Sequence, residues 1–128
     1  MQLEATTFHA VQILCHLHKH QEADKAMNIA RSVGITSPNA TRIMARLKRY
    51  GYVKSISGHR GGYTLGMRAE EISFYDVFLA LEGDPYSTHC LADSCTHESR
   101  NCKTHKFLTT LQNNVIEEML GTSIDDLV

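Results

Sequence analysis

The stretch GITSPNATRIMARLKRYG, residues 34–51, decides the fold that the sequence predicts. Asp24 is a plausible N-cap for a short helix predicted over residues 26–33. Gly34 can end this helix, because glycine readily takes the left-handed conformation that closes a helix. Ser37 can cap the next helix, and Pro38 suits its first position, where no backbone N–H is needed. The stretch therefore predicts two helices with a sharp turn between them.

The second of these helices is expected to run from Pro38 to Tyr50 and to have two different sides. Its apolar side repeats at helical spacing, at Ala40, Ile43, Met44 and Leu47. The opposite side is mainly polar and basic, with Asn39, Thr41, Arg42, Ala45, Arg46 and Arg49. Two helices joined by a glycine-containing turn, the second basic on its exposed face, indicate a helix-turn-helix.

A β-hairpin is predicted directly after this motif. Residues 52–57 alternate with period two, and a glycine-rich turn over 58–62 leads into a second short strand. A hairpin in this place is typical of a wing, and Arg60 at its tip would be attracted into a narrow minor groove. Gly61 and Gly62 would permit positive φ and a close approach to another backbone. The alternative is an ordinary hairpin whose arginine faces solvent.

Charge is divided unevenly along the 128 residues. The stretch from Lys25 to Arg68 holds nine Lys or Arg and no Asp or Glu, whereas the remainder holds four basic and fourteen acidic residues. This segregation is typical of a nucleic-acid-binding half joined to a half with another task, although a solvated basic face is the alternative. The length suits one compact domain, and no apolar run is long enough to span a membrane.

Three further helices are predicted outside this half. Residues 4–20 place Phe8, Val11, Leu14, Cys15 and His18 at helical spacing, and Cys15 is expected to be a small buried apolar residue. A capping-box-like start at Ser73 and Asp76 opens a strongly apolar helix that ends at Gly83. The last helix, from about residue 101 to Gly121, has nearly a heptad seam, for which a symmetry-related copy is the expected partner. Packing onto its own chain is the alternative.

The segment CLADSCTHESRNCKTH, residues 90–105, has the spacing of a metal site. Three thiolates and an imidazole form the soft donor set that suits zinc or an iron-sulfur cluster. If the chain is helical from about residue 101, Cys102 and His105 lie at i and i+3 on one face. Cys90 and Cys95 would then join them from the preceding loop.

Other uses of these cysteines stay open. They could form a thiol redox switch, hold a structural zinc ion or pair as disulfides, and a Cys102–His105 pair could serve an enzyme or an electron carrier. Residues 1–7 carry neither a basic region nor an apolar run, so we expect no secretory signal, a cytoplasmic protein and no structural disulfides. We also expect no enzyme, because no substrate-binding glycine loop is evident and an electron carrier needs neither a basic half nor a wing.

Together these residues resemble the IscR/NsrR type of bacterial winged-helix transcriptional regulators, the Rrf2 family. The likeness covers nearly the whole chain, at Met1-Gln2-Leu3, Ile29-Ala30, Gly34-Ile35-Thr36, Leu47, Gly51-Tyr52-Val53, Gly58, Gly61 to Leu65, the three cysteines and Ile124-Asp125-Asp126-Leu127. It implies a mainly α fold with a small β-hairpin, a winged helix-turn-helix with a long C-terminal dimerisation helix. Residues 1–83 would bind DNA, 84–105 would form the cysteine-rich cluster-binding loop, and 106–128 would form the dimerisation helix and tail of one compact domain.

The resemblance also implies a cofactor and a function. A 2Fe-2S or 4Fe-4S cluster would be held by Cys90, Cys95 and Cys102, and a homodimer would repress transcription in response to redox state, nitric oxide or cluster supply. The branch that regulates cluster assembly takes a histidine three residues after the last cysteine as fourth ligand, which matches His105. The nitric-oxide branch takes an acidic residue near position 8 of the partner's first helix, where this chain has Phe8, with His9 as the outside candidate.

The resemblance implies palindromic double-stranded DNA as the partner, bound by the helix 38–50 and the wing 58–63. We expect Thr36 and Ser37 to hold phosphates, Asn39, Arg42 and Arg46 to reach base edges or phosphates, and Arg60 to probe a minor groove. The full set of expected DNA contacts is Thr36, Ser37, Asn39, Thr41, Arg42, Arg46, His59, Arg60, Gly61 and Tyr63.

Overall fold

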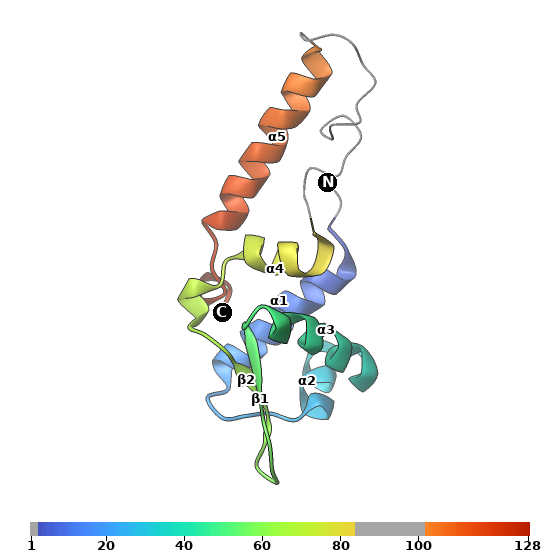
Figure 1. Ribbon diagram of the computed structural model, residues 1–128, viewed down its shortest axis with the longest axis vertical. Helices are drawn as coiled ribbons and strands as arrows, with labels where there is room; N and C mark the ends of the chain where they lie inside the picture. The colour runs from blue at the N-terminus through green and yellow to red at the C-terminus, as the bar shows by residue number, and fades with distance from the viewer. Residues whose placement is uncertain (1–2, 84–101) are drawn as a thin grey trace.

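The computed structural model describes residues 3–83 and 102–128. Its elements are α1 (Ala5–Lys19), α2 (Ala26–Val33), α3 (Ser37–Arg49), β1 (Val53–Ile56), β2 (Gly62–Leu65), α4 (Phe74–Glu82) and α5 (Lys103–Leu120), with 3-10 turns η1 (Ala69–Glu71) and η2 (Asp125–Leu127). Helices α1 to α4 form a body, the hairpin extends from one end and α5 projects from the other (Figure 1). The mainly helical winged helix-turn-helix predicted from the sequence is confirmed.

One hydrophobic core joins the helices of the body. The apolar side predicted for α3 is confirmed, because Ala40, Ile43, Met44 and Leu47 are all at most 1% exposed. They pack with buried residues of the other elements, among them Ile13, Leu14, Ile29, Val53, Ile72, Val77 and Ile124. Since buried apolar area is the main favourable term in folding, this shared core fixes how α3 sits on the body.

The helix ends follow local capping chemistry. Gly34 closes α2 with φ 82°, and Ser73 and Asp76 form the predicted capping box at the start of α4. The cap of α3 is Thr36 rather than Ser37, since the Thr36 hydroxyl accepts the backbone N–H of Asn39 at 3.3 Å. Both residues can cap, and the choice shifts the helix start by one residue.

The hairpin is held to the body through the connection between α1 and α2. β1 and β2 pair antiparallel, with Val53 opposite Leu65, and the backbone N–H and C=O of Tyr63 both bond to Asp24. Gly62 has φ 149°, and a Cβ there would lie 2.2 Å from the Asp24 carbonyl oxygen. Gly61 has no positive φ, and its Cβ would instead lie 2.0 Å from the carbonyl oxygen of Ile56. The two glycines therefore permit close backbone approach, as predicted, and only Gly62 also needs positive φ.

The first helix buries a stripe that matches the predicted one only in part, since Val11 and Leu14 are buried as expected. Thr7, Ala10, Val11, Ile13, Leu14 and Leu17 face the core. The expected apolar residue Phe8 is 48% exposed. Because α1 is covered by α2, α3 and α4 on several sides, its buried face is set by these neighbours, and Phe8 lies outside that face.

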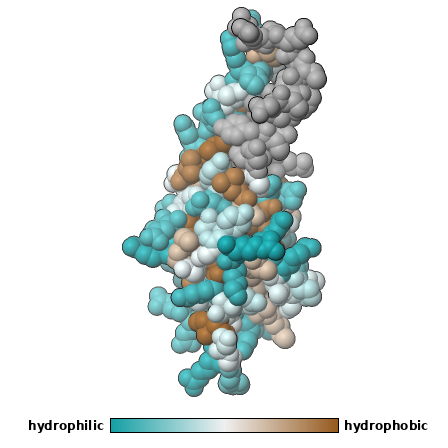
Figure 2. Space-filling model, viewed as in Figure 1, coloured by the Kyte–Doolittle hydropathy of each residue, from teal (hydrophilic) through white to brown (hydrophobic). Residues whose placement is uncertain are grey.

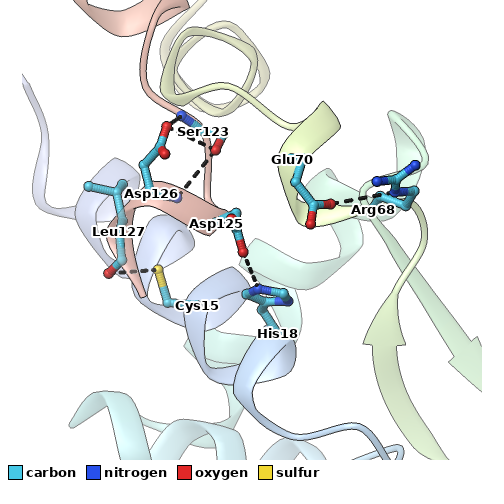
Figure 3. Close-up of polar contacts among 8 residues, drawn as sticks. All are labelled: Cys15, His18, Arg68, Glu70, Ser123, Asp125, Asp126 and Leu127. Atoms are coloured by element: carbon cyan, nitrogen blue, oxygen red, sulfur yellow. Dashed lines mark hydrogen bonds and ion pairs between the residues drawn. The ribbon is translucent and has the colours of Figure 1, made fainter.

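The C-terminal segment returns to pack on α1 (Figure 3). His18 Nε2 lies 2.8 Å from Asp125 Oδ1, and the Cys15 thiol lies 4.0 Å from the Leu127 carbonyl oxygen. Cys15 is partly buried and packs against the core, and burial, which outweighs the opposing charge of Lys19, raises the pKa of its thiol above its usual value. Among the described helices none has the length and apolar character to cross a bilayer.

Candidate nucleic-acid interface and cysteine site

The N-terminal turn of α3 forms the floor of an open hollow. The hollow has a volume of about 450 Å³ and is lined by Thr36, Pro38, Asn39 and Arg42. The guanidinium of Arg42 donates from Nη2 to Asn39 Oδ1 at 2.6 Å, so these two expected DNA contacts are already joined. Helix N-termini attract phosphates through their unpaired N–H groups and the helix dipole, and an arginine beside such an end adds a full charge. The hollow can therefore accept a phosphate or another anion.

Two further basic residues of α3, Arg46 and Lys48, have acceptors within the chain. Arg46 donates from Nη1 to the carbonyl oxygen of Leu81 at 3.0 Å, and Lys48 Nζ lies 2.8 Å from Ser55 Oγ on β1. The first contact joins α3 to the end of α4, and the second joins α3 to the wing. Arg46 thus lies on the basic side of α3, as predicted, but its guanidinium already donates a hydrogen bond to the neighbouring helix α4.

The wing presents its tip to solvent. His59 and Arg60 are exposed, and Gly58 turns the chain with φ 103°. Tyr63 is half-buried, and its backbone is used to anchor the wing on Asp24. Thr41 is exposed on α3 and Ser37 is half-buried at its start. Most of the predicted DNA contacts therefore lie on two features, the start of α3 and the wing tip, whereas Arg46 lies further along α3 and Tyr63 lies on β2.

The basic half of the sequence forms one end of the molecule. The stretch with nine basic and no acidic residues runs through α2, α3 and the hairpin, which lie together at the end opposite α5 (Figure 1). Arg68, at the limit of this stretch, pairs with Glu70 at 3.5 Å on the surface. Such clustering produces a positive potential of the kind that polyanions follow to a binding surface.

The cysteine site is described only in part. Cys90 and Cys95 lie outside the described residues. Cys102 is the half-buried N-cap of α5, and its carbonyl oxygen accepts the N–H of Lys106. The helical turn so formed places Cys102 and the exposed His105 at i and i+3, as the sequence predicted. Within residues 3–83 and 102–128 no three donor side chains meet that could hold a metal, so the described pair fits a soft metal as half of a ligand set.

Sequence reasoning missed the role of Asp24, which was predicted only to cap α2. Lys25 is the N-cap, and the Asp24 carboxylate accepts from the Lys25 N–H, from Asn28 and from His16 Nε2 at 2.7 Å. Burial alone would raise the pKa of Asp24, but these hydrogen bonds outweigh it and hold the pKa below its usual value. The only signal in the sequence was an acid directly before the basic stretch, and it did not identify His16 as the partner.

Helix α5 leaves an apolar surface uncovered. It buries only Gln112 and Met119, whereas Phe107, Leu111 and Leu120 are about half exposed or more. Figure 2 shows apolar patches along the lower part of α5 and where it meets the body. Phe107 and Leu111 lie one helical turn apart on one face of α5. Phe8 of α1 is exposed to a similar extent.

Known proteins match this chain over nearly its full length. The sequence model of the Rrf2 family, described as iron-dependent transcriptional regulators, matches residues 3–128. The regulator IscR of Pectobacterium atrosepticum is 27% identical over 112 residues, covering 88% of this chain and 68% of that protein. A putative helix-turn-helix regulator of Aquifex aeolicus is 31% identical over 108 residues, covering 81% of this chain and 74% of that protein.

Solved structures share the fold. CymR of B. subtilis, described as the global cysteine regulator of that organism, has a TM-score of 0.86 at 22% identity, covering 99% of this chain and 95% of that one. IscR of T. potens has a TM-score of 0.82 at 21% identity, covering 99% and 85%. These similarities confirm the sequence-based resemblance at the level of family and fold.

Proposed function

Because this chain belongs to the Rrf2 family of transcriptional regulators, we propose that it is a homodimeric repressor that binds palindromic DNA and senses redox state, nitric oxide or cluster supply through an iron-sulfur cluster. The observation that carries the DNA-binding part is the stretch of residues 25–68, which forms α2, α3 and the wing and holds nine basic residues and no acid.

The proposed DNA contacts divide by chemistry. Thr36, Ser37 and the N–H groups at the start of α3 hold a phosphate, while Arg42, braced by Asn39, reaches a base edge or phosphate. The exposed Arg60 at the wing tip enters an adjacent minor groove. If a dimer neutralises about eight phosphates, log K falls against log salt with a slope of roughly −7. A slope near zero would contradict DNA binding.

A second copy of the chain is the proposed cover for the apolar face of α5. The helix has 18 residues and is therefore about 27 Å long. It packs on α4 at one part of its length and leaves Phe107 and Leu111 exposed. Pairing about a two-fold axis would bury these side chains and would set two copies of α3 at the spacing of a palindrome.

The proposed cluster ligands are Cys90, Cys95, Cys102 and His105. The positions of Cys102 and His105 on one turn support this set, and relatives such as IscR supply the family context. When bound, a cluster supplies a centre that oxidants and nitric oxide can alter. The role of Cys102 is to join the metal to the first turn of α5, so that ligation orders the start of the proposed dimer helix.

A thiol switch without a cluster is the second candidate. The likeness in fold to CymR, the global cysteine regulator of B. subtilis, favours it. In this case Cys102 would respond to oxidants directly, and the same helix start would carry the response. A structural zinc ion in the cysteine segment is the remaining alternative.

Metal content separates these candidates. The protein is purified without oxygen, and its absorption spectrum, iron, acid-labile sulfide and zinc are measured beside Cys102→Ala and Cys15→Ala. We expect brown protein with iron and sulfide that Cys102→Ala loses and that Cys15→Ala keeps, because Cys15 packs on the core between α1 and the C-terminal segment. Colourless protein after anaerobic reconstitution would contradict the cluster and leave the switch or zinc.

A further inference from the structure

The contact between Arg46 and Leu81 joins the recognition helix to the end of α4. Arg46 lies on the basic side of α3, but its Nη1 donates to the carbonyl oxygen of Leu81 at 3.0 Å, across 35 positions of sequence. The last carbonyl groups of a helix have no partner within it, and a guanidinium there also interacts favourably with the helix dipole. The contact therefore gives the Leu81 carbonyl at the end of α4 a hydrogen-bond partner, and it also restrains the orientation of α3.

The same end of α4 is held from a second side. The carboxylate of Glu82 accepts the backbone N–H of Glu4 and the hydroxyl of the fully buried Thr7, both at the start of α1. The buried side chain of Leu81 adds an apolar contact to the core. The end of α4 is thus a support held from two sides, by the start of α1 and by Arg46 of α3.

Arg42 provides the contrast on the same helix. It lies one turn before Arg46, and its guanidinium binds Asn39 at the open hollow at the N-terminus of α3. Asn39 is itself an expected DNA contact, so Arg42 stays within the interface, whereas Arg46 is directed to another helix. Two arginines of one basic face therefore have different partners.

We propose that Arg46 is a positioning residue, which sets the orientation of α3 by binding the Leu81 carbonyl and does not neutralise a DNA phosphate. The inference rests on the proposed DNA binding. It predicts that replacing Arg46 reduces the preference for one DNA sequence over another. The affinity for duplex DNA in general should change less. A phosphate contact would have the opposite signature, because it weakens binding to all sequences and lowers the salt dependence.

The test compares Arg46→Gln with the matched variant Arg42→Gln. A duplex is first selected from a random library with the full-length wild-type protein, and dissociation constants are then measured for it and for a scrambled duplex over a series of KCl concentrations. For Arg42→Gln we expect the slope of log K against log salt to shrink by about 2, since a dimer loses two charges at the DNA. For Arg46→Gln we expect less than half of that change, with the preference for the selected duplex reduced about ten-fold, the usual cost of one misread base pair.

A DNA-free measurement keeps the inference testable on its own. The Gly83 amide donates to the Leu79 carbonyl at the end of α4, so its hydrogen exchange reports on the support. We expect Arg46→Gln to speed this exchange about five-fold, the effect of one ordinary hydrogen bond, and Arg42→Gln and Arg46→Lys to leave it nearly unchanged, because lysine can still donate to Leu81.

The outcomes separate this inference from the proposed function. A wild-type slope near zero would contradict DNA binding, whatever the exchange shows. If the wild type binds DNA, a slope change in Arg46→Gln equal to that in Arg42→Gln overturns the positioning role in favour of a phosphate contact. Unchanged Gly83 exchange in Arg46→Gln also overturns it, because the support would then not depend on Arg46.

Discussion

The carboxylate of Asp24 lies 2.7 Å from Nε2 of His16, and this contact joins α1 to the connection that anchors the wing. The backbone of Asp24 pairs with Tyr63 on β2, while its side chain also binds the first residues of α2. One residue therefore ties together two helices and the hairpin. Replacing Asp24 should therefore destabilise the wing as well as the two helices.

Asp24→Asn should destabilise the protein at neutral pH but not in acid. The folded-state pKa of Asp24 is below the ordinary 3.8, so its carboxylate contributes stability above about pH 4 that is lost as the pH falls through the folded value. We expect a loss of about 1–2 kcal/mol at pH 7, which is part of the roughly 1.5–3 kcal/mol that a hydrogen bond to a charged group contributes, because asparagine keeps a neutral acceptor. Thermal unfolding at pH 7 and pH 3 measures it. The matched Asp125→Asn, in the more exposed pair with His18, should lose less, and equal losses would contradict the special place of Asp24.

Gly62→Ala should detach the wing from the body. The new Cβ would meet the Asp24 carbonyl oxygen at 2.2 Å, and φ 149° is itself unfavourable for alanine. We expect a loss of more than about 2 kcal/mol, with the amides of Asp24 and Tyr63 exchanging faster. Gly58→Ala is the control, since its φ of 103° is also positive but no atom lies within 4 Å of its Cβ. It should lose about 1 kcal/mol from backbone strain alone. If both variants lose the same, steric contact with Asp24 is not what requires Gly62.

Leu111→Glu should convert the proposed dimer into a monomer. The side chain is half exposed on the face of α5 that also carries Phe107, so a charge there would be buried in the dimer without a partner. Analytical ultracentrifugation should show a dissociation constant raised by at least 100-fold, with little change in helix content. Asn113→Glu is the control, because two positions along a helix turn the side chain to a different face. A dimer that survives Leu111→Glu would place the interface elsewhere.

Cys15 should react slowly with alkylating reagents. Burial raises the pKa of its thiol, so the reactive thiolate is scarcer at neutral pH than for an ordinary cysteine. Pulses of iodoacetamide between pH 7 and pH 10, read by mass spectrometry on metal-free protein, should label Cys15 later than an unstructured cysteine peptide. Because the pKa of this thiol is higher in the folded state, the free energy of unfolding should fall as the pH rises above the unfolded-state pKa of about 8.5. Cys15→Ala should remove that loss. Rapid labelling at pH 7 would contradict the burial.

Much of the fold could be predicted because its signals are local. The apolar side of α3, the glycine that ends α2 and the capping box at Ser73 each depend on residues within one or two turns. The choice of Thr36 over Ser37 as cap could not be predicted, since both hydroxyls have suitable chemistry one residue apart. At the candidate site, the expected DNA contacts could be named from the sequence. The pair Cys102–His105 could also be predicted, because its spacing requires only one helical turn. Their roles in binding stay predictions.

By itself the sequence determined the order of the elements, the basic half and the winged helix-turn-helix, because periodicity, caps and glycines act over a few residues. Only the tertiary structure decided that Phe8 faces outward, that Arg46 binds Leu81 and that Gly62 must pass close to Asp24. Each of these depends on which surfaces the shared core brings together. A side chain's partner across 35 or more positions is set by that packing, and no local pattern records it.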